Sequence, residues 1–423
     1  MNEEKTAVGP EVARAFEALK TLPAVKEALR LVRERLPETI EVQKELALIE
    51  APSRHEQKKA ARYAELLRGA GLEEVETAPS GNVFGFVRGG GRTGSSVLLE
   101  GHLDTVFSFG DVKGLFVDAE GRIHCPGICD DTRALAANLA VLKALRACGI
   151  RPHHDLVFAG TVCEEGLGAM DGMKRLLGED LPARTKLLAS ISIDGGSRGT
   201  FYANATGMVD WQVDYEGPGG HVWTAWGEPS AVHAAARAAA KLADLELPAE
   251  PKTVLSVTLI EGGQAIHGIA SRASFKVNAR SNSATVLERL NQRMQELFQA
   301  GADEENARWE TPGRIRMSCR KILDIPAGSQ PESSRIVQAA RAASLAAGVQ
   351  PRLLPGGCTN GNIAIACGIP AVTLSRGGEE FGTHTLAEWF DPRGVWVCEQ
   401  RSLLLLLALA GVEGELAPLD LRV

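Results

Sequence analysis

Five short polar segments of the sequence carry imidazole and carboxylate side chains, the kinds of group that bind divalent metal ions. In chain order they are Gly101-His102-Leu103-Asp104-Thr105, Gly127-Ile128-Cys129-Asp130-Asp131, Cys163-Glu164-Glu165-Gly166, Ile193-Asp194-Gly195-Gly196 and Gly382-Thr383-His384-Thr385. Carboxylates gathered at one place repel one another unless a cation neutralises them. Imidazole and carboxylate ligands without thiolate suit Zn²⁺, and also Co²⁺ or Mn²⁺. The segments therefore predict a site for divalent metal ions.

Each segment taken alone has an ordinary structural explanation. A single His102 is more often a hydrogen-bonded histidine of the interior than a ligand, and Asp130-Asp131 alone would cap a helix. Glu164-Glu165 alone would be a solvated turn. The metal site is favoured because the first four segments follow expected strands or open an expected helix, in order along one chain.

The elements expected around these segments explain why they would meet. Apolar runs of strand length cover Ser96–Gly101, Leu156–Val162 and Leu187–Ile193, and each run leads into one of the polar segments. Helices are expected between the runs, at Thr132–Ala147 and around Ala169–Leu177. Strands that alternate with helices indicate an α/β fold with a mostly parallel sheet covered by helices. In such sheets the ligand site lies beyond the carboxyl ends of the strands.

A different pattern begins near Gly207 and lasts for about a hundred residues. It reads strand, helix, strand, strand, helix, strand, which is the order of a small ferredoxin-like α+β domain. These elements are expected at Met208–Tyr215, Ser230–Leu245, Thr253–Ile260, Ser274–Arg280, Thr285–Phe298 and Arg314–Arg320. We therefore expect one α/β domain, residues 1–206 and 321–423, interrupted by an inserted domain at residues 207–320.

Further helices and one strand complete the expected α/β domain. Apolar spacing predicts three helices near the N-terminus and two near the C-terminus, and a short apolar run predicts a strand between the latter. The helices are Val12–Leu19, Val25–Leu36, Val42–Ile49, Ser333–Ala347 and Val395–Ala410, and the strand is Ala371–Leu374.

The composition excludes several classes of protein. Of the 423 residues, 44% are hydrophobic and 23% are charged, as in globular domains, and the net charge of -7 with no basic tract argues against nucleic-acid binding. The acidic start, Met1–Lys20, is unlike a signal peptide, and the longest apolar run, Leu403–Ala410, is far shorter than the ~20 residues of a membrane span. The eight cysteines show no metal-binding or redox spacing, so we expect reduced thiols in a cytosolic protein.

The ordered segments GHLDT, GICDD, CEEG, SIDGG and GTHTLAEWFD resemble those of the two-zinc exopeptidase and deacylase family. Its members include peptidase T, carboxypeptidase G, acetylornithine deacetylase and succinyl-diaminopimelate desuccinylase. The resemblance runs from about Val42 to the C-terminus and includes the inserted domain, which is a lid in that family. The closing segment His384–Asp391 looks most like that of peptidase T-type members.

The resemblance implies a set of ligands for two divalent ions per subunit, with zinc as the expected metal. His102 and Asp194 would bind one ion, Glu165 and His384 the other, and Asp130 would bridge the two. Two ions held in this way activate a water molecule and polarise the scissile carbonyl.

Two further residues of these segments have implied roles without binding metal. Asp104 would orient the imidazole of His102, and Glu164 would be the general base that takes a proton from water and passes it to the leaving amine. Cys129 and Cys163 adjoin the segments, and we expect neither to be a ligand.

Four residues elsewhere resemble substrate-binding positions of the family. His221, in Gly217-Pro218-Gly219-Gly220-His221, resembles a lid histidine that donates to the oxyanion and that reaches the partner's site in dimeric members. Arg280 resembles a lid arginine that binds a substrate carboxylate, although a loop histidine and a surface arginine are the simpler alternatives. Gly357 lies in a Gly-rich substrate loop. The chain departs from the family at His267, where asparagine is common, and at Thr132, where a basic residue is common.

The resemblance implies a cytosolic, zinc-dependent hydrolase that cleaves the amide bonds of short peptides. An N-acyl amino acid deacylase with the same machinery is the first alternative, and a catalytically silent metal-binding protein is the second. We expect neither nucleic acid nor membrane as a partner. We expect a homodimer through the inserted domain, because unpaired sheet edges favour pairing with a second copy.

Overall fold

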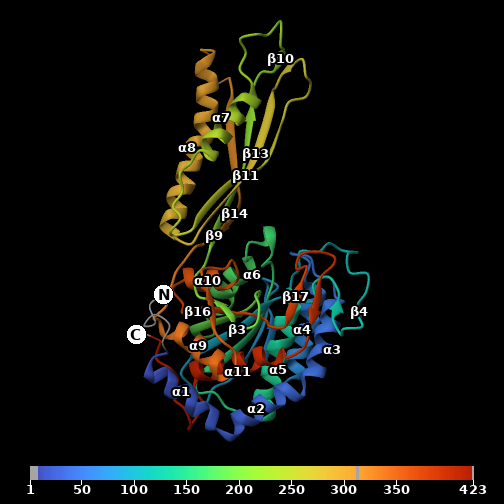
Figure 1. Cartoon of the computed structure of the whole chain (residues 1–423), viewed down its shortest axis with the longest axis vertical. Coiled ribbons are helices and arrows are strands. Elements are labelled where there is room, and N and C mark those ends of the chain that lie inside the picture. The colour runs from blue at the N-terminus through green and yellow to red at the C-terminus, as the bar shows by residue number, and fades with distance from the viewer. Residues whose placement is uncertain (1–7, 311–313, 422–423) are drawn as a thin grey trace. The chain divides into compact units, whose positions relative to one another are not determined.

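The computed structural model describes residues 8–310 and 314–421, so the first seven residues of the expected acidic start lie outside the described residues. The chain forms two compact units (Figure 1). Unit 1 consists of the described residues up to Asn204 and from Gln330 onward, and unit 2 spans Ala205–Ser329. The second boundary thus lies after residue 320, because the last strand of unit 2 continues to Ile325 and Gly328 still pairs with Ala205.

Unit 1 contains an eight-stranded sheet in the order β1-β2-β6-β3-β7-β16-β8-β15. The four central strands, β6, β3, β7 and β16, run parallel, whereas β2 and β8 pair antiparallel with their central neighbours. This confirms the mostly parallel sheet. The bounds are β1 (Glu73–Thr77), β2 (Val83–Val87), β3 (Ser95–His102), β6 (Asp155–Thr161), β7 (Lys186–Ile193), β8 (Thr200–Tyr202), β15 (Arg352–Leu354) and β16 (Ala371–Leu374).

Helices cover the sheet of unit 1 and share one hydrophobic core with it (Figure 1). Prolines at the first or second position of α1, α2 and α3 preset the helical backbone there. The run Leu403–Ala410 is buried in α11, as its composition predicted. The helices are α1 (Pro10–Thr21), α2 (Pro23–Glu34), α3 (Leu36–Ala47), α4 (Gln57–Gly69), α5 (Thr132–Ala147), α9 (Arg335–Ala346), α10 (Gly361–Ala366) and α11 (Trp396–Ala410).

A second, smaller sheet of unit 1 joins two distant parts of the chain. Its strand order is β17-β18-β5-β4, with all pairs antiparallel. The β17–β18 hairpin encloses residues 382–388, and β5 leads into residues 125–131, so two of the polar segments are brought beside each other. The strands are β4 (Phe116–Val117), β5 (Ile123–His124), β17 (Glu379–Phe381) and β18 (Trp389–Asp391).

Unit 2 has the ferredoxin-like arrangement that its element order predicts. Its antiparallel sheet has the order β11-β13-β9-β14, and the alternate buried residues of β9 and β13 pack against two helices. A two-stranded ribbon, β10 with β12, lies outside this sheet. The elements are β9 (Gly207–Glu216), β10 (Gly220–His221), α7 (Ala231–Ala243), β11 (Thr253–Gly262), β12 (Gly268–Ile269), β13 (Arg272–Ser281), α8 (Ala284–Arg308) and β14 (Arg316–Ile325).

Two expected helices have other bounds than the apolar spacing predicts. In place of one helix at 169–177, α6 covers only Asp171–Arg175 and a π-helical turn follows at Leu176–Asp180. The cause is the left-handed backbone of Ala169 and Met170, which no helix continues through. Helix α8 extends ten residues beyond Phe298, and its small Gly301 lets this part approach α7 closely. Small residues leave no strong apolar repeat, so the apolar spacing does not predict the extension.

Among the described residues, no helix combines the length and the apolar character that crossing a bilayer requires.

Candidate metal centre

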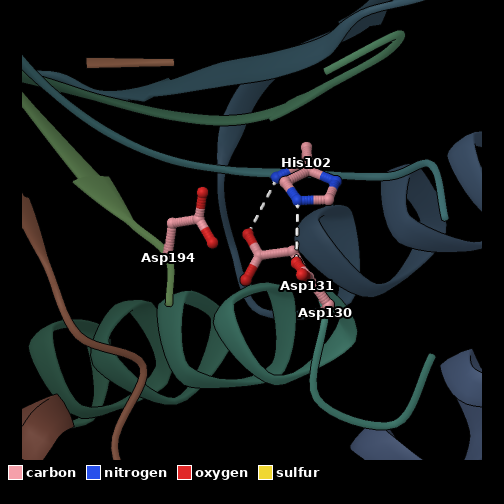
Figure 2. Close-up of side chains that lie close together, drawn as sticks. All are labelled: His102, Asp130, Asp131 and Asp194. Atoms are coloured by element: carbon pink, nitrogen blue, oxygen red, sulfur yellow. Dashed lines mark hydrogen bonds and ion pairs between the residues drawn. The ribbon is translucent and has the colours of Figure 1, made fainter. Parts of the chain in front are cut away.

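Gly101 and His102 end the central strand β3, where the sheet approaches the start of α5. A Cβ at Gly101 would lie 2.9 Å from Asp131 Oδ2 and 2.8 Å from Ala134 Cβ, so only glycine fits there. The His102 backbone N–H donates to Asp131 Oδ2 at 3.0 Å (Figure 2). Asp131 therefore does not cap α5 with its side chain, and instead fixes the strand end.

The imidazole of His102 is buried and oriented by Asp104. Its Nδ1 lies 3.0 Å from the Asp104 carbonyl oxygen and 3.4 Å from Asp104 Oδ1. A carbonyl oxygen only accepts, so Nδ1 carries the hydrogen and Nε2 is the nitrogen left to bind a cation. The sequence predicts that the Asp104 carboxylate orients His102. The structure adds a second orienting contact, from the Asp104 backbone carbonyl.

The carboxylate of Asp104 also holds the segment that follows β6. It accepts the backbone N–H groups of Glu164 at 2.9 Å and Glu165 at 3.0 Å, and the hydroxyl of Ser53 at 2.6 Å. Although burial opposes it, hydrogen bonding from His102 and Ser53 lowers the pKa of Asp104. Asp104 thus positions two polar segments at once, and Ser53 is a supporting residue that no sequence motif indicated.

Asp130 lies between the two histidines. Its Oδ1 is 3.1 Å from His102 Nε2, and its Oδ2 is 3.1 Å from His384 Nε2 (Figure 2 shows the His102 side). His384 Nε2 is also 3.0 Å from Glu165 Oε1. Segments more than 200 residues apart in sequence therefore meet at this carboxylate.

The two adjacent glutamates point to different partners. Glu165 contacts His384, whereas Glu164 Oε2 lies 4.0 Å from His102 Nε2. Burial, with the negative charges of Asp194 and Glu165, raises the pKa of Glu164 well above its ordinary value, and the charge of His102 opposes this rise. Glu164 is therefore a carboxylate with a raised proton affinity that faces the first histidine.

Asp194 follows β7 and completes a group of four side chains with His102, Asp130 and Asp131 (Figure 2). Burial and the neighbouring charge of Asp130 raise the pKa of Asp194 to about 7. Asp131 Oδ1 is buried and makes no hydrogen bond. An excess of buried carboxylate oxygen at one point is what a bound cation would neutralise.

The donor atoms fit divalent ions in chemistry and in spacing. Three groups of His, Asp and Glu each have ligand atoms within 4.8 Å of one another: His102 with Asp130, Asp131 and Asp194; His102 with Glu164 and Glu165; and Asp130 with Glu165 and His384. Nitrogen and oxygen ligands about 2.0–2.2 Å from one ion lie roughly 3 Å or slightly more apart, which is the separation of the contacting atoms here. Two neighbouring ions that share Asp130 fit this arrangement.

The two neighbouring thiols are directed to other partners. Cys129 Sγ donates to the Trp389 carbonyl at 3.4 Å, and Cys163 Sγ lies 3.4 Å from Glu56 Oε1. Burial raises the pKa of Cys163 to about 12, and that of Cys129 also lies well above its ordinary value. Both side chains are therefore protonated thiols in these surroundings.

Glu388 connects the His384 loop to the Asp130 loop. One of its oxygens accepts the N–H groups of Cys129 at 2.8 Å and Asp130 at 3.3 Å, and the other accepts that of Gly127 at 2.9 Å. Glu388 lies within the segment HTLAEWFD, but its distance from His384 in the sequence does not predict a role for it. The structure shows that Glu388 holds the backbone of Asp130 and of the residues before it.

The predicted substrate residues are divided between the units. Gly357 belongs to unit 1, where its N–H donates to the Asn204 carbonyl at 3.2 Å and a Cβ would lie 2.9 Å from the Tyr202 ring. His221 ends β10 in unit 2 and pairs with Gly268 of β12, His267 directly precedes β12, and both histidines are exposed. Arg280 is exposed on β13, where its Nε donates to Asn278 Oδ1 at 3.2 Å.

Within unit 2, Arg280 and His221 lie at opposite ends of the sheet. Arg280 pairs with Met208 at the start of β9, whereas His221 follows Glu216, the end of β9. Eight residues of antiparallel strand span roughly 27 Å. A single copy of unit 2 therefore does not present both side chains to one small molecule.

Comparisons with known proteins agree with the fold. The sequence matches the model of Peptidase family M20/M25/M40 over residues 98–407, well over half of the chain. The uncharacterized protein YgeY of Escherichia coli (strain K12) is 29% identical over 128 residues, which are 29% of this chain and only 31% of that relative's length.

Two solved structures share the fold. A tripeptidase from Staphylococcus aureus superposes with a TM-score of 0.74 at 21% identity, over 88% of this chain and 97% of that chain. Aminopeptidase PepT from Bacillus cereus superposes with a TM-score of 0.73 at 20% identity, over 88% of this chain and 97% of that chain. Identities this low show the common fold alone. The match over residues 98–407 shows that this chain belongs to Peptidase family M20/M25/M40.

Proposed function

We propose that this protein is a two-metal hydrolase, with zinc as its metal, that cleaves the amide bonds of short peptides. The observation that carries the proposal is the position of Asp130, whose two oxygens face His102 and His384 separately. His102 and Asp194 would hold one ion, Glu165 and His384 the other, and Asp130 both. When bound, such ions polarise the scissile carbonyl and lower the pKa of a water molecule.

Glu164 is the general base of this proposal. Its Oε2 lies 4.0 Å from His102 Nε2, and its raised pKa suits a group that accepts a proton and returns it. Asp104 holds its backbone N–H, so Glu164 has a fixed position relative to His102. The proton taken from water would pass to the amine that leaves.

The inserted unit would supply substrate contacts. His221 would donate to the oxyanion, Arg280 would bind a substrate carboxylate and His267 would contact the substrate, and Gly357, which belongs to unit 1, would also contact it. We propose that a homodimer provides them, since one unit 2 holds His221 and Arg280 at opposite ends of its sheet. The exposed Leu259 and Ile260 on the edge strand β11 offer a pairing surface.

A substrate panel tests the function. The protein, reconstituted separately with Zn²⁺, Co²⁺ and Mn²⁺, is assayed on dipeptides and tripeptides and on N-acetyl and N-succinyl amino acids. Cleavage confined to the peptides supports the proposal. Cleavage of the N-acyl amino acids alone would identify a deacylase with the same centre, and bound metal without turnover on any substrate would identify a silent binding protein.

A further inference from the structure

Arg376 is a buried arginine beside the candidate metal centre that no motif indicated. Only 1% of its surface is exposed. It follows β16, whose Leu374 pairs with Ile193 of the parallel strand β7. The two strands end side by side, so Arg376 lies next to Asp194, which follows Ile193.

One nitrogen of Arg376 contacts both aspartates of the first site. Nη1 lies 2.7 Å from Asp130 Oδ1 and 3.0 Å from Asp194 Oδ1, with Asp131 Oδ1 at 3.5 Å. An Nη1 group has two hydrogens, one for each of the two nearer carboxylates. The separation and orientation of these two carboxylates therefore depend on one guanidinium.

Glu380 fixes the other side of that guanidinium. Its Oε2 accepts from Arg376 Nε at 3.0 Å and its Oε1 accepts from Nη2 at 3.4 Å. Arg401 in turn donates to the Ser375 carbonyl at 2.7 Å and so holds the backbone before Arg376. The Arg376–Glu380 pair is neutral as a whole, and it presents N–H groups rather than a free positive charge to the centre.

We infer that Arg376, held by Glu380, is a positioning residue for the first metal site. It acts through Asp130 and Asp194, holding both in the arrangement in which they and His102 take one divalent ion. The second site shares Asp130 with the first, but through Oδ2, which faces His384, whereas Arg376 contacts Oδ1. Glu165 and His384 make no contact with Arg376 among the described residues, so the second site depends on it less than the first. The inference rests on the proposed two-metal function.

The decisive variant removes the pair without changing the net charge. Arg376→Met with Glu380→Gln deletes one positive and one negative group, so a change in metal affinity reports positioning rather than charge. Metal content by mass spectrometry and Zn²⁺ titration by calorimetry are measured on the metal-free protein. The first site should weaken about 10- to 100-fold, as is usual when residues that orient ligands are lost, and the second, which shares only Asp130, should weaken less.

Backgrounds with one site assign the loss. In His384→Ala, which leaves the first site, the double variant should lower the Zn²⁺ affinity by the same factor, and in His102→Ala it should lower the affinity less. Arg341→Met is the matched control, because Arg341 is a buried arginine of unit 1 that pairs with Glu332 and lies outside the centre. Arg376→Lys keeps the charge but has a single donor nitrogen, so it should give an intermediate affinity.

Three results would overturn the inference. They are wild-type affinities at both sites in the double variant, an equal loss at both sites, and a loss in Glu380→Gln alone that the double variant restores. The last result would show that charge, not position, is what Arg376 supplies. Thermal unfolding in the presence of a chelator, compared with that of Arg341→Met, shows whether the double variant is folded. If the double variant misfolds, the Zn²⁺ affinity of Arg376→Lys decides the inference. If the wild-type protein binds fewer than two ions, the proposed function fails instead.

Discussion

Apart from the exposed His384, the residues of the candidate centre in unit 1 and the predicted substrate residues in unit 2 have opposite surroundings. In unit 1, His102 is 2% exposed and Asp104 is fully buried, and their side chains contact the other members of the centre. In unit 2, His221 and Arg280 are exposed, and each side chain forms a hydrogen bond with a near neighbour in sequence. Buried, mutually bonded groups define a site by themselves, whereas exposed groups define one only together with whatever they meet.

The largest expected effect lies in unit 1 and tests whether adjacent carboxylates have separate tasks. Glu164→Gln should keep both ions and lower kcat about 10²–10⁴-fold, because proton transfer is lost. Glu165→Gln should lose metal together with activity. Metal content and kcat are measured on both variants. If Glu164→Gln loses metal while Glu165→Gln keeps it, the two roles are reversed.

The next effect tests whether unit 2 acts across a subunit boundary. His221→Ala should lower kcat about 10²–10³-fold, as the loss of an oxyanion donor does. Mixing it with inactive Glu164→Gln should restore up to about a quarter of the wild-type activity, since mixed dimers pair one intact base with one intact donor. Light scattering checks the oligomeric state. An active monomer, or a mixture without recovery, contradicts action between subunits.

Arg280 should affect recognition with a smaller effect. Arg280→Lys keeps the charge but loses the planar pair of donors, so kcat/KM should fall about 10- to 100-fold for substrates with a free carboxylate. Amidated forms of the same substrates should be affected little. Arg272→Lys is the matched control, because Arg272 is exposed at the other end of the same strand. Equal losses on both substrate types would make Arg280 structural.

The smallest effect is a pH dependence within unit 1. Hydrogen bonding to Asp130 and Glu165 raises the pKa of His384 to about 10 in the metal-free protein, so its stabilising contribution is full below pH 6.5 and is lost as the pH rises through 10. An ion displaces that proton, so Zn²⁺ affinity should rise between pH 6.5 and 9. Calorimetry in buffers of different ionisation enthalpy measures the proton release. An affinity independent of pH in that range contradicts the contact.

Local patterns predict the elements of this fold where one period governs a segment. The helix at Thr132–Ala147 and the strand at Ala371–Leu374 have the predicted bounds. Strand β14 begins two residues later than expected. It also ends five residues later, because a bulge between Lys321 and Leu323 shifts the register and interrupts the alternation there. A bulge depends on the neighbouring strand and leaves no local period.

The same distinction holds for the candidate centre. The five polar segments are visible in the sequence because each joins chemistry-bearing residues to the end of an element. Arg376 and Glu388 are not, because their partners are Asp130 and its neighbours, about 250 residues earlier in the chain. Such supporting contacts depend on how distant segments of the chain pack together. Residue type and local spacing do not predict that packing.

Because unit 2 is inserted into unit 1, the two parts of the candidate metal centre are synthesised at different times on the ribosome. Asp130 and His384 are 254 residues apart, and unit 2 lies wholly between them. Unit 2 is contiguous, so it can fold while the earlier carboxylates still wait for β16, Arg376 and His384. The centre is therefore completed only when His384 has been synthesised, and a translation product that stops before that residue has the earlier carboxylates without His384.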